Sequence, residues 1–295
     1  MLPPATIVGN TSETALLLLQ LANDEGEALA RRKPGGWAAM NAEYDFTTAA
    51  VTTTGTLNGT NTITNVANVG AIAPNTWHVV GSGGYPNNTI VNTVVGSTIT
   101  VSAATGTSGA LQPLTFGQSD YPLPADFQRP IDGTFWDRSR FWQMRGALSP
   151  QQWQMYKSSV LGTSATIQRR YRIRNVAGTV YLSIDPVPTD NDSALVFEYV
   201  SNAWCASSVG ALQTQWAADT DVGVLDEFLI RKGVQWRLLE RLGMAYDVAQ
   251  AEYEDLADRA VAHDAGTQIL EMVKTAGLTL IGPQNVPETG FGSSG

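Results

Sequence analysis

The chain has 295 residues, and 18 basic against 27 acidic side chains give it a formal net charge of −9. This length predicts about two domains, and the acidic excess argues against a surface that grips nucleic acid throughout, because phosphate binding needs a basic footprint. The single cysteine, Cys205, excludes an internal disulfide, and the residues after Met1 lack the basic and apolar stretches of a signal peptide. We therefore expect a protein made in the cytosol, and no apolar run approaches the roughly 20 residues that span a bilayer.

The first predicted element is a helix over residues 12–33. Thr11 or Ser12 provides its cap, apolar side chains recur at helical spacing through Leu29, and the basic residues 31–33 suit the negative end of the helix dipole. The sequence Pro-Gly-Gly at 34–36 ends the helix, and residues 37–46 are predicted to form a strand.

The next 73 residues, 47–119, contain no Asp, Glu, Lys or Arg. They are rich in Thr, Asn, Gly and Val, with alternating runs at 62–66, 76–80 and 97–101 that are separated by Gly-Gly, Asn-Gly and Pro-Asn turns. β-Branched residues that alternate with small polar ones are typical of strands. We therefore predict a small antiparallel β domain at 47–117, inserted into a charged body formed by 1–46 and 118–263.

After the insertion, three prolines between residues 122 and 130 predict an extended, loop-like path. Ser149 and Gln152 have the spacing of a capping box around Pro150, which predicts a short helix through Lys157. Runs at 165–174, 178–185 and 194–201 predict a three-stranded antiparallel meander.

Two longer helices are predicted at 224–242 and 245–262, with Gly243 as the end or hinge between them. The segment 264–295 is rich in Gly, Pro and Thr and is predicted to be an extended C-terminal arm. The predicted fold class is α+β: a helical-bundle body with a small antiparallel sheet, plus the inserted all-β domain.

Residues with catalytic or ligand-binding chemistry are scarce. The only two histidines, His78 and His263, lie in different parts of the chain, which argues against a metal site. Cys205 has no nucleophile signature, and the match of 290–295 to Gly-x-Gly-x-x-Gly has no strand before it and no room for a helix after it. We expect no cofactor, no metal and no enzyme. An enzyme that uses a carboxylate pair from Asp120, Asp126, Asp132 and Asp137 is a remote alternative.

Charge is segregated along the sequence. Residues 129–174 contain nine basic and two acidic side chains, whereas 185–227 contain eight acidic and no basic ones. The arginines of 169–174 are compatible with a solvated strand face, a contact with DNA, or a head-to-tail contact between subunits. Six tryptophans between 136 and 236 likewise suit either core packing or a protein interface.

The order of several motifs resembles one family. They are Tyr121-Pro-Leu-Pro-Ala-Asp-Phe127 with Arg129-Pro130, then Phe135-Trp136-Asp137, Tyr171-Arg-Ile173, Phe197-Glu-Tyr-Val-Ser201 with Trp204, and Asp219-Thr-Asp221 ahead of Leu225, Leu229, Gly233, Trp236-Arg237 and Gly243. Together, over residues 1–46 and 118–263, they resemble the head-to-tail adaptor (connector) proteins of short-tailed bacteriophages, the tail tubular protein A class.

That resemblance implies a structural virion protein without catalytic activity. Such proteins form a ring, usually of twelve copies, between the capsid portal and the tail nozzle, and DNA passes through it. Their helices pack side by side around the ring, and the C-terminal segment, here 264–295, reaches toward the portal. Subunit or portal contacts are accordingly expected from the following side chains: Arg169, Arg170, Arg172, Arg174, Asp219, Asp221, Trp236 and Arg237.

The inserted domain looks like an immunoglobulin-like or related β module of phage structural proteins. At the ring's periphery it could seat tail fibres. The alternative hypothesis is a glycan-binding or host-recognition tail protein, in which Trp77, Tyr85 and the Asn-rich turns of this module contact sugars.

Overall fold

A computed structural model describes residues 6–86, 88–158, 168–176 and 178–264. Strands account for 33% and helices for 26% of it, and within the described residues the strands form four antiparallel sheets beside four α-helices. The predicted helical-bundle body with one small sheet is therefore wrong. Many strands of the body are only two to four residues long, too short for an alternating pattern to show in the sequence.

The described residues form two compact units. Unit 1 contains 6–43, 124–131 and 198–264, and unit 2 contains 44–123 and 132–197. The helices and strands of unit 1 are α1 (Glu13–Arg32), η1 (Ala38–Met40), β9 (Phe127–Pro130), β15 (Cys205–Ala206), β16 (Leu212–Gln213), β17 (Val222–Gly223), α3 (Glu227–Arg241) and α4 (Asp247–Asp264). The strands β1 (Asn41–Thr47) and β14 (Ala194–Ser201) contribute residues to both units.

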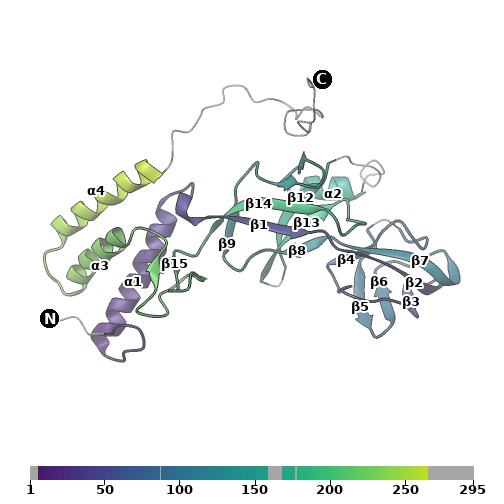
Figure 1. Cartoon of the computed structure of the whole chain (residues 1–295), viewed down its shortest axis with the longest axis horizontal. Helices are drawn as coiled ribbons and strands as arrows, with labels where there is room; N and C mark the ends of the chain where they lie inside the picture. The colour runs from purple at the N-terminus through teal and green to yellow at the C-terminus, as the bar shows by residue number, and fades with distance from the viewer. Residues whose placement is uncertain (1–5, 87, 159–167, 177, 265–295) are drawn as a thin grey trace, which may run out of the picture. The chain divides into compact units, whose positions relative to one another are not determined.

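Three helices of unit 1 lie side by side, with α3 packed against both α1 and α4 (Figure 1). We call α1, α3 and α4 the helical layer. The predicted helices are confirmed: Ser12 Oγ accepts a hydrogen bond from Ala15 N at the start of α1, and Asp226 accepts one from Phe228 N at the start of α3. Gly243 has a φ of +66°, in the left-handed region that favours glycine, and ends the turn after α3 as predicted. The predicted strand at 37–46 begins later, because η1 occupies 38–40.

The core of unit 1 is centred on Trp204, which is almost fully buried. A Cβ added to Gly26 of α1 would lie 2.4 Å from this ring, so only glycine lets the helix approach so closely. Trp216 meets Trp204 edge to face at 5.2 Å, and Trp37 Nε1 donates to the Leu29 carbonyl at 2.7 Å. The short sheet β16-β15-β17 places Trp204 and Cys205 beneath the helices.

The remaining helices and strands belong to unit 2. They are β2 (Ala50–Asn58), β3 (Thr62–Thr64), β4 (Trp77–Val79), β5 (Val91–Val95), β6 (Thr98–Val101), β7 (Ser108–Gln118), β8 (Asp120–Pro122), β10 (Trp136–Asp137), β11 (Trp142–Gln143), α2 (Pro150–Ser158), β12 (Arg170–Val176) and β13 (Thr179–Asp185). The capping box before α2 is confirmed, since Ser149 Oγ accepts from Gln152 N while Gln152 Oε1 accepts from Ser149 N. Part of the strand predicted at 165–174, and the predicted C-terminal arm from residue 265, lie outside the described residues.

The three strands of the expected meander do not form one sheet. β12 and β13 pair, but the other neighbour of β13 is β8, and β14 belongs to the sheet β1-β14-β10-β11, with β9 also paired to β14. The connection after β13 is not a tight hairpin: Asp190 and Asn191 within it accept hydrogen bonds from Thr48 Oγ1 and Ala50 N. The proline-rich 120–130 is extended as predicted, yet it forms β8 and β9 rather than a loop, because proline is tolerated at strand ends and edges.

The all-β module predicted at 47–117 is present, but it is a single six-stranded antiparallel sheet of order β4-β7-β2-β3-β6-β5. Its two ends meet: His78 is bridged to Ile90, and Val79 N donates to the Thr89 carbonyl at 2.9 Å. The sheet therefore curls into a small barrel around Ile99, Leu114 and Phe116, instead of forming the two facing sheets of an immunoglobulin-like sandwich. We refer to β2–β7 as the barrel.

Candidate functional site

Arg169, a predicted interface residue, is buried within unit 2. Its Nε lies 3.1 Å from Asp137 Oδ2, its Nη2 donates to Ser193 Oγ at 2.7 Å, and Asp190 lies 3.7 Å away. Burial lowers the pKa of Arg169. Asp137 was also a candidate for a catalytic carboxylate pair, and the structure uses it as the partner of this arginine.

The other arginines of this run lie on β12. The Arg170 guanidinium lies 3.9 Å from the centre of the Tyr156 ring and 3.5 Å from Asp185 Oδ2. Arg174 Nη2 donates to Asp120 Oδ1 at 2.9 Å, and Arg172 is half-buried. Because three of these four guanidinium groups have carboxylate partners in unit 2, much of the charge segregation in the sequence is balanced by intramolecular pairs.

This network extends to the barrel, all within unit 2. Lys157 Nζ lies 2.7 Å from Asp185 Oδ1 and donates to Asn88 Oδ1 at 3.0 Å. His78 is buried nearby and its Nδ1 has no hydrogen-bond partner. Burial, reinforced by the positive charge of Lys157, lowers the pKa of His78 to about 4. The sequence gives no local signal for this cluster of His78, Asn88, Lys157 and Asp185, because most of its members are tens of residues apart.

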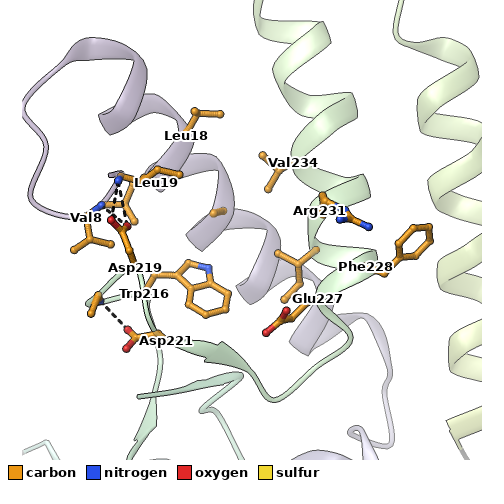
Figure 2. A pocket seen from close by; sticks show the side chains of 14 residues that line it. Val8, Leu18, Leu19, Trp216, Asp219, Asp221, Glu227, Phe228, Arg231 and Val234 are labelled. Atoms are coloured by element: carbon orange, nitrogen blue, oxygen red, sulfur yellow. Dashed lines mark hydrogen bonds between the residues drawn. The ribbon is translucent and has the colours of Figure 1, made fainter. Parts of the chain in front are cut away.

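A cavity in unit 1 lies between α1 and α3 (Figure 2). It encloses about 530 Å³ and is mainly apolar. Its lining includes Leu18, Leu19, Trp216, Phe228, Ile230 and Val234. We call this cavity the α1–α3 pocket. A cavity of this size and composition suits apolar side chains of a partner or a small apolar ligand.

Two predicted interface residues, Asp219 and Asp221, form the edge of the α1–α3 pocket. Asp219 accepts hydrogen bonds from Ile7 N and Val8 N, at 3.1 and 2.9 Å, and so holds the N-terminal segment as one wall (Figure 2). Asp221 accepts from the backbone N–H groups of residues 217 and 218 at 2.7 and 2.8 Å. Both carboxylates therefore fix the walls and leave a negative rim.

The other two predicted residues of unit 1, Trp236 and Arg237, lie further along α3. Trp236 is buried in the core, and Arg237 Nε donates to Glu25 Oε2 at 2.6 Å. Glu25 is fully buried on α1 and also accepts a hydrogen bond from the Tyr253 hydroxyl. Burial and the bond to Glu25 raise the pKa of Tyr253. This cluster ties α1, α3 and α4 together.

Gly233 makes room for the buried carboxylate. A Cβ at this position would lie 2.1 Å from Glu25 Cδ, so a larger residue would expel the side chain. The helical spacing of α3 shows that position 233 faces a neighbour, but the sequence does not reveal that the neighbour is a charged group. The Glu25 cluster is therefore the structural feature that sequence reasoning missed most completely.

The residues of the alternative hypotheses also have structural contacts. Trp77 is inside the barrel core, and Tyr85 packs against that core half-buried. Asp126 accepts hydrogen bonds from the Tyr199 hydroxyl at 3.1 Å and from Ser201 Oγ at 2.7 Å. Cys205 is buried, and burial raises the pKa of its thiol to about 11.

Within the described residues, no three His, Cys, Asp or Glu side chains are grouped so that they could hold a metal ion. Among the helices that the structure describes, none is both long enough and apolar enough to cross a membrane. Comparison of the chain with protein-family models, characterised proteins and solved structures finds no match.

Proposed function

We propose that this chain is a structural protein of a bacteriophage virion, a head-to-tail adaptor without catalytic activity. Several copies, twelve in the usual arrangement of such adaptors, form a ring between the capsid portal and the tail nozzle. The ring retains packaged DNA and lets it pass during ejection. The protein is made in the host cytoplasm and ends at the head–tail junction of the particle.

The observation that carries this proposal is the way the motif residues of the resemblance meet in unit 1. Trp204 packs against Gly26 of α1, Gly233 accommodates Glu25, and Arg237 pairs with that same carboxylate. These three motif residues pack α1 against the core and against α3, and Tyr253, which also bonds to Glu25, adds α4 to the layer. Side-by-side helices are what the resemblance implies for packing around a ring.

The charge of the chain also supports a conduit. With a formal net charge of −9, the protein as a whole repels the phosphate backbone rather than attracting it. Because three of the clustered arginines are paired with aspartates inside unit 2, they offer little free positive charge for DNA. Such a surface limits adhesion of DNA during passage.

The glycan-binding alternative has less support. Trp77, the aromatic residue on which stacking against a sugar would depend most, has its side chain in the core of the barrel. The barrel instead offers a compact, uncharged domain that could seat tail fibres or other tail components, and we propose that role for it.

The test is native mass spectrometry of the full chain mixed with the portal and nozzle proteins of the same virus. We expect a complex that contains many copies of this chain bound to the portal ring, and addition of the nozzle protein should extend it. An acidic protein of similar mass serves as the control for non-specific association. A chain that stays free at all concentrations with both partners would contradict the proposal.

A further inference from the structure

Three side chains that can react with one another meet in unit 2, where the barrel contacts α2. Lys157 Nζ, near the end of α2, donates to Asn88 Oδ1 at 3.0 Å and lies 2.7 Å from Asp185 Oδ1 at the end of β13. An amine, a carboxamide and a carboxylate that moves protons are the groups needed to build an amide bond between two side chains. The proposed adaptor function requires none of the three.

We propose that Lys157 and Asn88 form a covalent isopeptide bond, with Asp185 as the group that transfers the protons. The bond joins the end of α2 to a loop of the barrel, across 69 positions of the sequence. It braces the barrel against unfolding, as a disulfide would, in a module that contains no cysteine. This inference goes beyond the proposed function and does not depend on it, because the bond is made within one chain.

The carboxamide of Asn88 is held against Lys157 through both of its polar atoms. Its Oδ1 accepts from Lys157 Nζ, while its Nδ2 donates to the Lys157 carbonyl at 3.1 Å. Because a C=O bond is about 1.2 Å long, the 3.0 Å from Nζ to Oδ1 places Nζ within about 4.2 Å of Asn88 Cγ, the carbon that it attacks. Groups fixed this close together react far faster than the same groups on separate molecules.

The surrounding structure positions both partners. Asn88 has a φ of +64°, in the left-handed region that asparagine tolerates, and the next residue, Thr89, is almost fully buried. The Thr89 carbonyl accepts from Val79 N at 2.9 Å, at the seam where the barrel closes. On the other side, the ring of Trp153, one turn earlier in α2, has its centre 5.2 Å from Lys157 Nζ. The amine and the amide are thus both attached to packed structure.

The reacting groups are shielded from water. The side chains of Lys157 and Asp185 are only 14% and 8% exposed, and exclusion of water protects the product from hydrolysis. After the reaction Asp185 keeps a cationic partner, because Arg170 lies 3.5 Å from its other oxygen. Burial, the larger cause, still lowers the pKa of His78 when Lys157 has lost its charge.

The atoms and protons of the reaction balance without a cofactor. The ammonium group of Lys157 carries three protons. One passes to Asp185, which frees the electron pair of Nζ to attack Asn88 Cγ. The second passes to Asn88 Nδ2 as the bond between Cγ and Nδ2 breaks, and Nδ2 leaves as ammonia, which takes the proton from Asp185. The third stays on the nitrogen of the new amide.

Mass spectrometry of the full-length chain tests the proposal. Against the sequence mass of 31.6 kDa, we expect a loss of about 17 Da, which is one molecule of ammonia. Fragmentation of a digest should place residues 88 and 157 in one branched peptide. Trypsin should not cleave after Lys157, because an acylated lysine has lost its positive charge. A chain that keeps the unmodified mass, with a free Lys157 side chain, would overturn the proposal.

Four variants assign the reaction to its groups. Lys157→Arg keeps the positive charge without the amine, and Asn88→Gly suits the φ of +64° without the amide, so both should have the unmodified mass. Asp185→Asn should form the bond about 100-fold more slowly after refolding, because the proton acceptor is gone. Lys33→Arg is the matched control: Lys33 is also a largely buried lysine paired with an aspartate, Asp264, and its replacement should leave the loss of ammonia unchanged.

The other outcomes count against the proposal. An asparagine followed by glycine, such as Asn58, can also lose ammonia by forming a succinimide. A loss that persists in Lys157→Arg would therefore belong to another group and overturn the inference. Bond formation at the original rate in Asp185→Asn would remove the role of that carboxylate. If a variant fails to fold, the mass and the branched peptide of the original chain still decide, since they need no substitution.

Discussion

The helical layer and the barrel differ in whether their cores contain a charged group. The helical layer places a fully buried carboxylate, Glu25, between three helices and satisfies it with Arg237 and Tyr253. The barrel derives from a segment without a single charged residue, and its core around Ile99 and Phe116 is apolar. A buried charge is tolerated only with well-placed partners. The comparison teaches that a buried polar cluster fixes how the helices of unit 1 are oriented, whereas strand pairing fixes the arrangement of the barrel.

The largest effect is expected when a charge is placed in the barrel. Ile99→Lys buries an ammonium group with no partner, at a cost of several kcal/mol, and should unfold the barrel. Val95→Lys, at an exposed position of the same module, is the control and should leave stability unchanged. Circular dichroism and limited proteolysis of the full chain check this. A folded, protease-resistant barrel in the Ile99→Lys variant would show that its core can accommodate a charge.

Removing the cationic partner of Glu25 should lower the free energy of unfolding of unit 1 by nearly as much. Arg237→Met leaves the carboxylate of Glu25 buried and short of its cation, so we expect unit 1 to lose about 3–5 kcal/mol. Urea unfolding followed by tryptophan fluorescence measures this. The control is Arg31→Met, which breaks the exposed pair with Glu27 and should cost at most about 0.5 kcal/mol. The double variant Glu25→Gln with Arg237→Met should recover part of the lost stability, because it also removes the buried charge. If Arg237→Met and Arg31→Met lost the same free energy of unfolding, the burial of Glu25 would not explain the effect.

Acid should destabilise unit 2 through His78. Its pKa is about 4 in the folded protein against an ordinary value near 6.5, because burial and Lys157 disfavour its charged form while Asp120 and Asp185 only partly compensate. Above pH 6.5 His78 is neutral in both states and contributes no pH dependence. Between pH 6.5 and 4 only the unfolded chain takes up the proton. The free energy of unfolding should therefore decrease as the pH is lowered through this range, by about 3 kcal/mol in all. Unfolding curves across this range check the slope, and His78→Gln should remove it.

The smallest effect is expected at the helix cap of α2. Ser149→Ala removes both the acceptor for Gln152 N and the reciprocal geometry of the capping box, at a cost of about 1 kcal/mol. Hydrogen exchange of the first turn of α2 should rise while the barrel core stays protected. Ser149→Asp is the matched control, because aspartate also caps helices, and it should preserve the protection.

Local signals in the sequence were enough to predict several elements. Ser12 is a predicted side-chain cap that acts within three residues, and α1 begins directly after it. The start of α3 was predicted at 224, whereas Asp226 caps the helix and α3 begins at Glu227. The alternation of β-branched residues predicted an all-β module, because side chains of a strand face opposite sides in turn. It did not predict the closure into a barrel, since the contact between His78 and Ile90 depends on how the whole sheet curls.

For the candidate site, the expected contacts of Asp219 and Asp221 with another subunit or the portal stay a prediction. Asp219 and Asp221 were chosen from a resemblance, and the structure places both on the edge of the α1–α3 pocket. Trp236 and Arg237 were chosen in the same way, but they lie in the core and on the buried Glu25. The sequence did not predict that Leu242 and Met244, which follow α3, would be exposed. The apolar helical pattern of α3 continues up to Leu242, so it predicted burial there.

The sequence by itself determined the caps, the glycine that ends α3 and the uncharged, strand-forming composition of the module, because each depends on neighbours within a few positions. Tertiary structure alone decided which arginines would be neutralised, that Glu25 would be buried, and which apolar residues would remain in water. Those outcomes depend on groups tens to hundreds of positions apart, such as Glu25 and Arg237, whose encounter is set by the packing of whole helices.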